Sequence, residues 1–199
     1  KKFKCSKANL VYSNDNNSKM TSLRKGVIIC GTDTDVGKTI ISALIVQGLK
    51  ATYWKPIQSG LEEGGDTGRV SRLLGLTSDR WIKEAYKFKA PVSPHWAAEK
   101  ERITINPKFL RLPKKKEFIV LETAGGLMVP LTRELIQIDQ VKAWNLPVIL
   151  VARSSLGTLN HTLLSLEALK KRDINVLGIF LNGEVHQDNP KTLEQFGKV

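Results

Sequence analysis

The stretch 31–39, which reads GTDTDVGKT, has the strongest chemical signal in the chain. It follows an apolar run at 27–30 and precedes a helical pattern that begins at Lys38. A turn from a buried strand into a helix presents backbone N–H groups and a helix N-terminus, which bind phosphate oxygens. Lys38 adds a positive charge for the β- and γ-phosphates, and the Thr39 hydroxyl is suited to ligate Mg²⁺. The pattern predicts a nucleotide-binding P-loop.

The spacing within this loop departs slightly from the usual P-loop. The usual pattern has a glycine where this chain has Thr32, and here Gly31 stands one place earlier. Gly37 keeps its usual place and permits close approach of the backbone to phosphate. We therefore interpret the stretch as a variant P-loop.

Other polar residues follow the remaining predicted strands. Lys55 precedes Pro56 in WKPIQSG, and a residue before proline is extended. Its positive charge could therefore be fixed near phosphate, although a surface lysine fits the sequence as well. Asp66 opens the next helix and is either a helix cap or a Mg²⁺ ligand. Glu122 follows the apolar run 118–121, at the end of a strand where nucleotide enzymes place a metal-binding acid.

The elements that must position these residues alternate along the chain. Apolar, β-branched runs predict buried strands at 27–30, 118–121, 148–151 and 176–181. Helical patterns between them cover 38–49, 67–74, 135–144 and 159–171. This alternation predicts an α/β fold: a doubly wound, mostly parallel sheet of the P-loop NTPase type with helices on both faces. Such sheets bind ligands at the carboxyl ends of their strands.

The chain length of 199 residues fits one domain, which we place at 25–199 with a short C-terminal end. Residues 1–24 are polar and aperiodic, so we expect a flexible N-terminal extension. Lys and Arg number 31 against 19 Asp and Glu, and this net charge of +12 favours anionic ligands. The basic clusters lack interleaved aromatic residues, so we expect solvated surface and no nucleic-acid partner.

Cysteine content and hydropathy bear on the compartment. The two cysteines have neither disulfide nor metal-ligand spacing, and no apolar run approaches the roughly 18 residues of a membrane span. We therefore expect a protein of the cytoplasm with no membrane partner.

Five motifs together resemble one enzyme family, dethiobiotin synthetase, from about residue 27 to the end. They occur in the order GTDTDVGKT, WKPIQSG, SPH at 93–95, ETAGGLMVPL and SSLGTLNHTLLSLEAL. The resemblance implies an ATP- and Mg²⁺-dependent ligase of biotin synthesis. Its implied substrates are 7,8-diaminononanoate, CO₂ and ATP, and its implied products are dethiobiotin, ADP and phosphate.

The resemblance also implies roles for individual residues. Lys38 and Lys55 would be catalytic together with Thr34, and Asp66 and Glu122 would join Thr39 as metal ligands. The nucleotide would be bound by Asp35, Val36, Gly37, Lys38, Thr39, Ile40 and Asn182, the last at the adenine ring. Substrate would contact Ser59, Gly125, Gly157, Thr158 and Asn160, of which the last three would come from the second subunit of a homodimer.

Two features of the chain depart from the family pattern, and alternatives stay open at this point. Thr123 stands where the family usually has glycine, beside the proposed metal acid, and the segment 105–118 is short enough that a helix there is reduced.

A partition-type ATPase acting as a nucleotide switch would share the P-loop sheet, but it should carry a second lysine near Thr32 and Asp33. A noncatalytic nucleotide-binding relative is a further alternative. A corrinoid-type amidation ligase would need a glutaminase domain, for which 199 residues leave no room. His95 is a candidate for lining the site.

Overall fold

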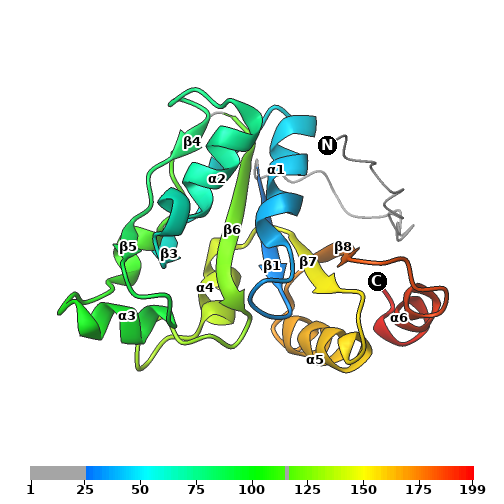
Figure 1. Cartoon of the computed structure of the whole chain (residues 1–199). Coiled ribbons are helices and arrows are strands. Elements are labelled where there is room, and N and C mark those ends of the chain that lie inside the picture. Colours follow the sequence, from blue (N-terminus) through cyan, green and yellow to red (C-terminus); the bar gives the residue numbers. More distant parts are fainter. Residues whose placement is uncertain (1–25, 115–116) are drawn as a thin grey trace.

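A six-stranded parallel sheet forms the centre of the computed structural model, which describes residues 26–114 and 117–199 (Figure 1). The strand order is β4-β2-β6-β1-β7-β8, and every neighbouring pair runs parallel. These strands are β1 (Gly26–Gly31), β2 (Thr52–Trp54), β4 (Trp81–Ile82), β6 (Ile119–Gly126), β7 (Val148–Arg153) and β8 (Val176–Asn182). A separate parallel pair joins β3 (Ile57–Ser59) to β5 (Tyr86–Phe88).

The chain winds outward from β1 in both directions, as the predicted doubly wound topology requires. The α-helices are α1 (Lys38–Gly48), α2 (Gly65–Leu74), α3 (Pro94–Lys100), α4 (Gln137–Trp144), α5 (Thr158–Lys170) and α6 (Asn189–Gly197). Two short 3₁₀ helices complete the described elements, η1 (Glu62–Gly64) and η2 (Pro107–Leu110). In Figure 1, α6 lies beside α5 near the C-terminus, and a Cβ on Gly197 would overlap Leu166 of α5.

Alternation along β1 divides the core into two layers, because successive side chains of a strand point to opposite faces. Val27 and Ile29 pack with residues of α1 and α2, whereas Ile28 and Cys30 pack with residues of α3, α4 and α5. Every residue of β1 is buried. The prediction of helices on both faces of a mostly parallel sheet is therefore confirmed.

The predicted elements are all present, and the largest error concerns β6. The sequence predicts that this strand ends at residue 121, but β6 continues to Gly126, so Glu122 lies within the strand instead of after it. The apolar pattern stops early because charged, hydroxyl and small residues occupy 122–126, of which Glu122, Ala124 and Gly125 line a cleft. Strands β3, β4 and β5 and helix α3, all of seven residues or fewer, were not predicted.

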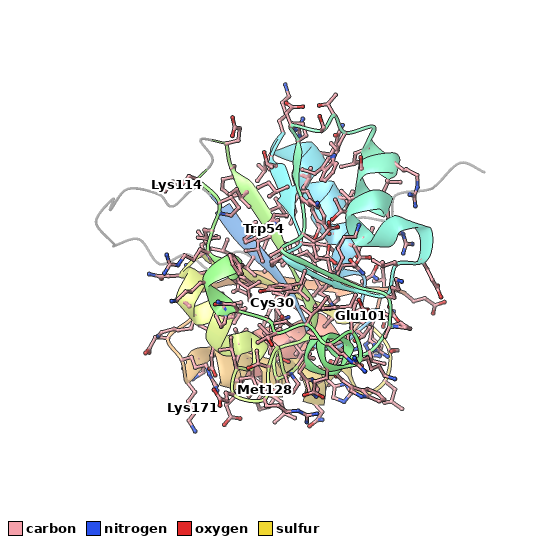
Figure 2. The ribbon with its side chains drawn as sticks, turned by 90° about the vertical axis from the view of Figure 1, so that its left-hand side faces the viewer. Cys30, Trp54, Glu101, Lys114, Met128 and Lys171 are labelled. Carbon is pink, nitrogen blue, oxygen red and sulfur yellow. The ribbon has the colours of Figure 1, made fainter. Side chains whose placement is uncertain are left out.

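The segment between Ile105 and Phe118 contains only η2 among its described residues, which agrees with the expectation of a reduced helix. The predicted N-terminal extension, residues 1–24, lies outside the described residues. In the described part of the chain no helix combines the length and apolar character needed to cross a membrane. Figure 2 shows Cys30 and Trp54 in the interior and the basic residues Lys114 and Lys171 at the margin of the molecule.

Candidate active site

The loop between β1 and α1 folds back over the side chain of Lys38. Lys38 Nζ donates to the backbone oxygen of Asp33 over 2.7 Å, and the lysine is buried. A Cβ on Gly31 would lie 2.8 Å from Lys38 Nζ, so a larger residue there would displace the lysine. This contact gives a physical reason for the glycine at position 31, one place earlier than the usual pattern.

Gly37 closes the loop in a left-handed conformation, with φ of +101°, which favours glycine. A Cβ at this position would also overlap the side-chain amide of Asn182, which comes from the end of β8. Asn182 Nδ2 donates to the backbone oxygen of Val36 over 3.0 Å. The end of β8 therefore packs against the P-loop and hydrogen-bonds to its backbone.

A buried polar network joins β2, α1, α2 and β6 at the carboxyl edge of the sheet. Lys55 Nζ lies 3.1 Å from Glu122 Oε1 and also donates to the carboxylate of Asp66. Thr39 Oγ1 donates to the same Glu122 Oε1 over 2.9 Å. Tyr53 completes the network by donating its phenol O–H to Glu122 Oε2 over 2.9 Å. Parallel strands bring these residues together because their carboxyl ends share one edge.

The electrostatics of the site separate its two lysines. Burial, and after it the neighbouring Lys55 ammonium, lowers the pKa of Lys38 to about 8. Burial also works against the charged form of Lys55, but Glu122 and Asp66 outweigh it and raise the pKa of Lys55. Burial opposes ionisation of Asp66, yet Lys55 lowers the pKa of that carboxyl. The charged forms of Lys55 and Asp66 are thus stabilised by each other. The charged form of Lys38 is not stabilised in this way and would gain from a bound anion.

A cleft of about 890 Å³ opens beside this network. The cleft is lined by eleven of the residues that the sequence analysis assigns to the site: Thr34, Asp35, Gly37, Lys38, Thr39, Ile40, Lys55, Ser59, Asp66, Glu122 and Gly125. The buried Oγ of Ser59 has no hydrogen-bond partner within the described part of the chain. An unpartnered hydroxyl in a cleft wall is available to a ligand.

The remaining predicted residues do not line this cleft. Val36 is fully buried beneath the loop, and Asn182 lies behind it. Gly157, Thr158 and Asn160 lie at the start of α5, outside the cleft. Thr158 is itself buried, and its N–H donates to the backbone oxygen of Ser155 over 3.1 Å, so that donor is already engaged.

Two expectations from the sequence need correction. His95 does not line the cleft, although its neighbours Ser93 and Pro94 do. Thr123 does not intrude beside Glu122, because consecutive residues of a strand point to opposite faces. Its Oγ1 instead donates to the backbone oxygen of Ile29 over 3.1 Å.

Residues that the sequence did not single out also belong to the site. Gln58 lines the cleft, donates to the backbone oxygens of Ser59 and Gly60, and accepts from the N–H of Asp66. Arg69 lines the cleft one helical turn after Asp66. The spacing of Asp66 and Arg69, which places them on one face of α2, is the signal that could have identified the arginine.

The donor set suits a hard cation. Hydroxyl and carboxylate oxygens, which Mg²⁺ prefers, come from Thr39, Asp66 and Glu122. Lys55 contacts both carboxylates, and Thr39 donates to Glu122, so the three groups lie close together. No group of three or more His, Cys, Asp and Glu side chains in the described ranges could hold a metal alone. Mg²⁺ commonly completes its shell with phosphate oxygens and water, so the set fits a metal that arrives with a nucleotide.

Comparisons with known proteins place the chain in a family. A family model described as an AAA domain matches residues 25–199. A protein of Rhodopseudomonas palustris strain BisA53 named ATP-dependent dethiobiotin synthetase BioD is 48% identical over 173 residues, which cover 87% of this chain and 81% of that protein. A protein of the same name from Nitrobacter hamburgensis is 46% identical over 173 residues, which cover 87% and 82% of the two chains. The chain belongs to the dethiobiotin synthetase family.

A solved structure supports the fold at greater distance. The kinase domain of the Escherichia coli tyrosine kinase ETK superimposes with a TM-score of 0.50 at 18% identity, over 84% of this chain and 71% of that one. This likeness concerns the fold alone. Membership of the dethiobiotin synthetase family supports a ligase and does not support the alternative of a nucleotide switch or a noncatalytic relative.

Proposed function

We propose that this protein is an ATP-dependent dethiobiotin synthetase. The substrates would be 7,8-diaminononanoate, CO₂ and ATP, and the products dethiobiotin, ADP and phosphate. The observation that carries the proposal is the convergence of Lys38, Lys55, Asp66 and Glu122 on one cleft. Two carboxylates, two ammonium groups and a P-loop suit a reaction in which several anions must meet.

The chemistry would proceed in three steps that need no protein nucleophile. A substrate amine forms a bond to the carbon of CO₂ and loses a proton, giving a carbamate. A carbamate oxygen then attacks the γ-phosphorus of ATP, the bond to the bridging oxygen breaks, and ADP leaves. Finally the second amine attacks the carbonyl carbon, loses a proton and expels phosphate, which closes the ureido ring. Cys30 is no nucleophile here, because burial raises its pKa to about 12.

The chain's residues would hold the anions in place. Lys38 would bind the β- and γ-phosphates, and Lys55 would leave Asp66 and Glu122 to stand between the carbamate and the γ-phosphate. Thr34 and Asp35 at the loop would face the reacting groups, and the unpartnered hydroxyl of Ser59 would contact the diamine. Mg²⁺, held by Thr39, Asp66 and Glu122, would neutralise charge on the phosphates when bound.

Nucleotide binding would extend from the loop toward β8. The backbone of residues 35–40, with Gly37 at its centre, would enclose the phosphates, and Asn182 would reach the adenine ring with its side-chain oxygen. Asn182 already donates through Nδ2 to Val36, which leaves Oδ1 as the acceptor for the amino group of adenine.

We propose a homodimer in which α5 of one subunit completes the site of the other. Gly157, Thr158 and Asn160 lie outside the chain's own cleft, and Leu156 before them is fully exposed. A second hollow of about 500 Å³ lies nearby and is lined in part by Leu127, Met128 and Leu164. Its apolar residues suit contact with a second copy, whose Gly157 and Asn160 would reach the substrate carboxylate. Gly125 would contact the substrate from the chain's own cleft.

The activity is tested by supplying isotopically labelled bicarbonate with ATP, Mg²⁺ and diaminononanoate, and by analysing the product by mass spectrometry. The proposal predicts dethiobiotin with the label in its ureido carbonyl carbon. A product without the label, or no product, would contradict it. We propose the cytoplasm as the compartment, because ATP is supplied there.

A further inference from the structure

The Tyr53 hydroxyl has a buried contact that none of the roles above explains. Its O–H donates to Glu122 Oε2 over 2.9 Å, and both side chains are 0% exposed to solvent. A buried carboxylate needs partners for both oxygens, because each unpartnered oxygen costs free energy of desolvation. Tyr53 supplies the partner for Oε2.

Strand pairing fixes this contact. In the parallel pair of β2 and β6, Tyr53 lies opposite Val120, and Glu122 is two residues further along β6. Residues two apart on a strand share a face, so a long side chain on β2 can reach across the diagonal. The Tyr53 ring packs in the core layer that contains Val46 of α1 and Val70 of α2. The ring is therefore held in place, and only its hydroxyl reaches the site.

The two oxygens of Glu122 face different partners. Oε1 accepts from Thr39 and lies 3.1 Å from Lys55 Nζ, on the side of the cleft. Oε2 accepts from Tyr53 on the side of the core.

We propose that Tyr53 is a positioning residue, whose hydroxyl fixes Oε2 of Glu122 so that Oε1 alone faces Thr39 and the magnesium of bound nucleotide. The inference rests on the proposed function, in which Lys55 leaves Glu122 to meet the carbamate. Once Lys55 has left, Tyr53 is the remaining core partner that keeps the carboxylate from rotating. Its effect should therefore depend on magnesium and not on the phosphate contacts of the P-loop.

The test compares Tyr53→Phe with Tyr86→Phe. Both changes remove one phenol oxygen, but Tyr86 lies on β5, where its hydroxyl accepts from the N–H of Asn106 over 2.8 Å, away from the cleft. Affinity for ATP is measured by calorimetry with Mg²⁺ and again in a chelator without it. Tyr53→Phe should weaken ATP binding about tenfold with Mg²⁺ and by less than about twofold without it, as expected for one lost hydrogen bond to a charged group. Tyr86→Phe should match the wild type under both conditions.

Two results would overturn the inference. One is Tyr53→Phe binding ATP as the wild type does with and without Mg²⁺. The other is an equal loss under both conditions, which would indicate a general structural role. The binding measurement needs no product, so it tests Tyr53 even if the wild type makes no dethiobiotin. In that case the proposed function fails, while the role of Tyr53 in magnesium-dependent nucleotide binding is judged separately.

Discussion

Lys55 Nζ lies 3.1 Å from Glu122 Oε1 and also binds the carboxylate of Asp66, which joins α2 to the central strand β6. All three charges are largely removed from solvent, so each depends on the others. Under the proposed function, magnesium would take the place of Lys55 between the two carboxylates when nucleotide binds. The proposed catalysis depends on this arrangement.

Replacing Lys55 by alanine should lower kcat by about 100- to 1,000-fold, because a positioned charge acts mainly on the transition state. The affinity for ATP should fall much less, because Lys38 and the P-loop bind the phosphates. Steady-state kinetics and calorimetry measure the two effects. Lys83→Ala, which removes an exposed lysine outside the cleft, serves as the control. Equal losses in kcat and affinity would make Lys55 a simple binding residue.

The pKa of about 8 for Lys38 predicts a pH dependence of nucleotide binding. Below that pH the lysine is charged in the free protein and binds phosphate directly. Above it the free lysine is neutral and must take up a proton on binding, so affinity for ATP should fall as pH rises through about 8. In Lys38→Arg the side chain stays charged, and this decline should disappear. An identical decline in Lys38→Arg would show that another group titrates.

Thr123 should matter for stability and not for catalysis. Its hydroxyl donates to the backbone oxygen of Ile29 and is absent from the cleft. Thr123→Val keeps the shape and removes that hydrogen bond, so the free energy of unfolding should fall by about 1 kcal/mol. Denaturant titration measures this change, and kcat should stay within about twofold of the wild type. A large loss of kcat with unchanged stability would place Thr123 in the substrate site.

Subunit mixing tests the proposed dimer. Lys38→Ala and Asn160→Ala would each be inactive alone, because one lacks a phosphate contact and the other a substrate contact. In a mixed dimer, the Asn160→Ala chain keeps Lys38 and receives Asn160 from its partner. Mixing the two variants under conditions of subunit exchange should therefore restore a fraction of wild-type turnover. No recovery in a verified mixed dimer would place Lys38 and Asn160 in the same subunit's site.

The sequence predicted the central strands of the sheet well, because a strand buried on both faces has a continuous run of apolar residues. It also placed Lys38, Lys55, Asp66 and Glu122 at one edge, since each follows or ends a predicted strand or opens a helix. It did not predict the end of β6, where the apolar pattern stops before the strand does. The shortest strands, such as β4 with two residues, leave too little pattern to detect.

Contacts that depend on register were beyond the sequence. Tyr53 and Glu122 are 69 residues apart, and only the alignment of β2 with β6 brings them together. Strand alternation determines which way the Thr123 side chain points. The sequence could not show this, because the strand was expected to end at residue 121, before Thr123. The role of Gln58 depends on the fold of the turn before α2, where its amide meets Asp66.

The most direct test of the account measures ADP release in the presence of ATP and Mg²⁺, with diaminononanoate and bicarbonate supplied separately, together or not at all. If the cleft exists to bring a carbamate beside the triphosphate, ADP should form rapidly only when both are present, since neither alone gives a carbamate on the substrate. Equal rates of ADP release in all four conditions would contradict the account and indicate an ATPase that does not use these substrates.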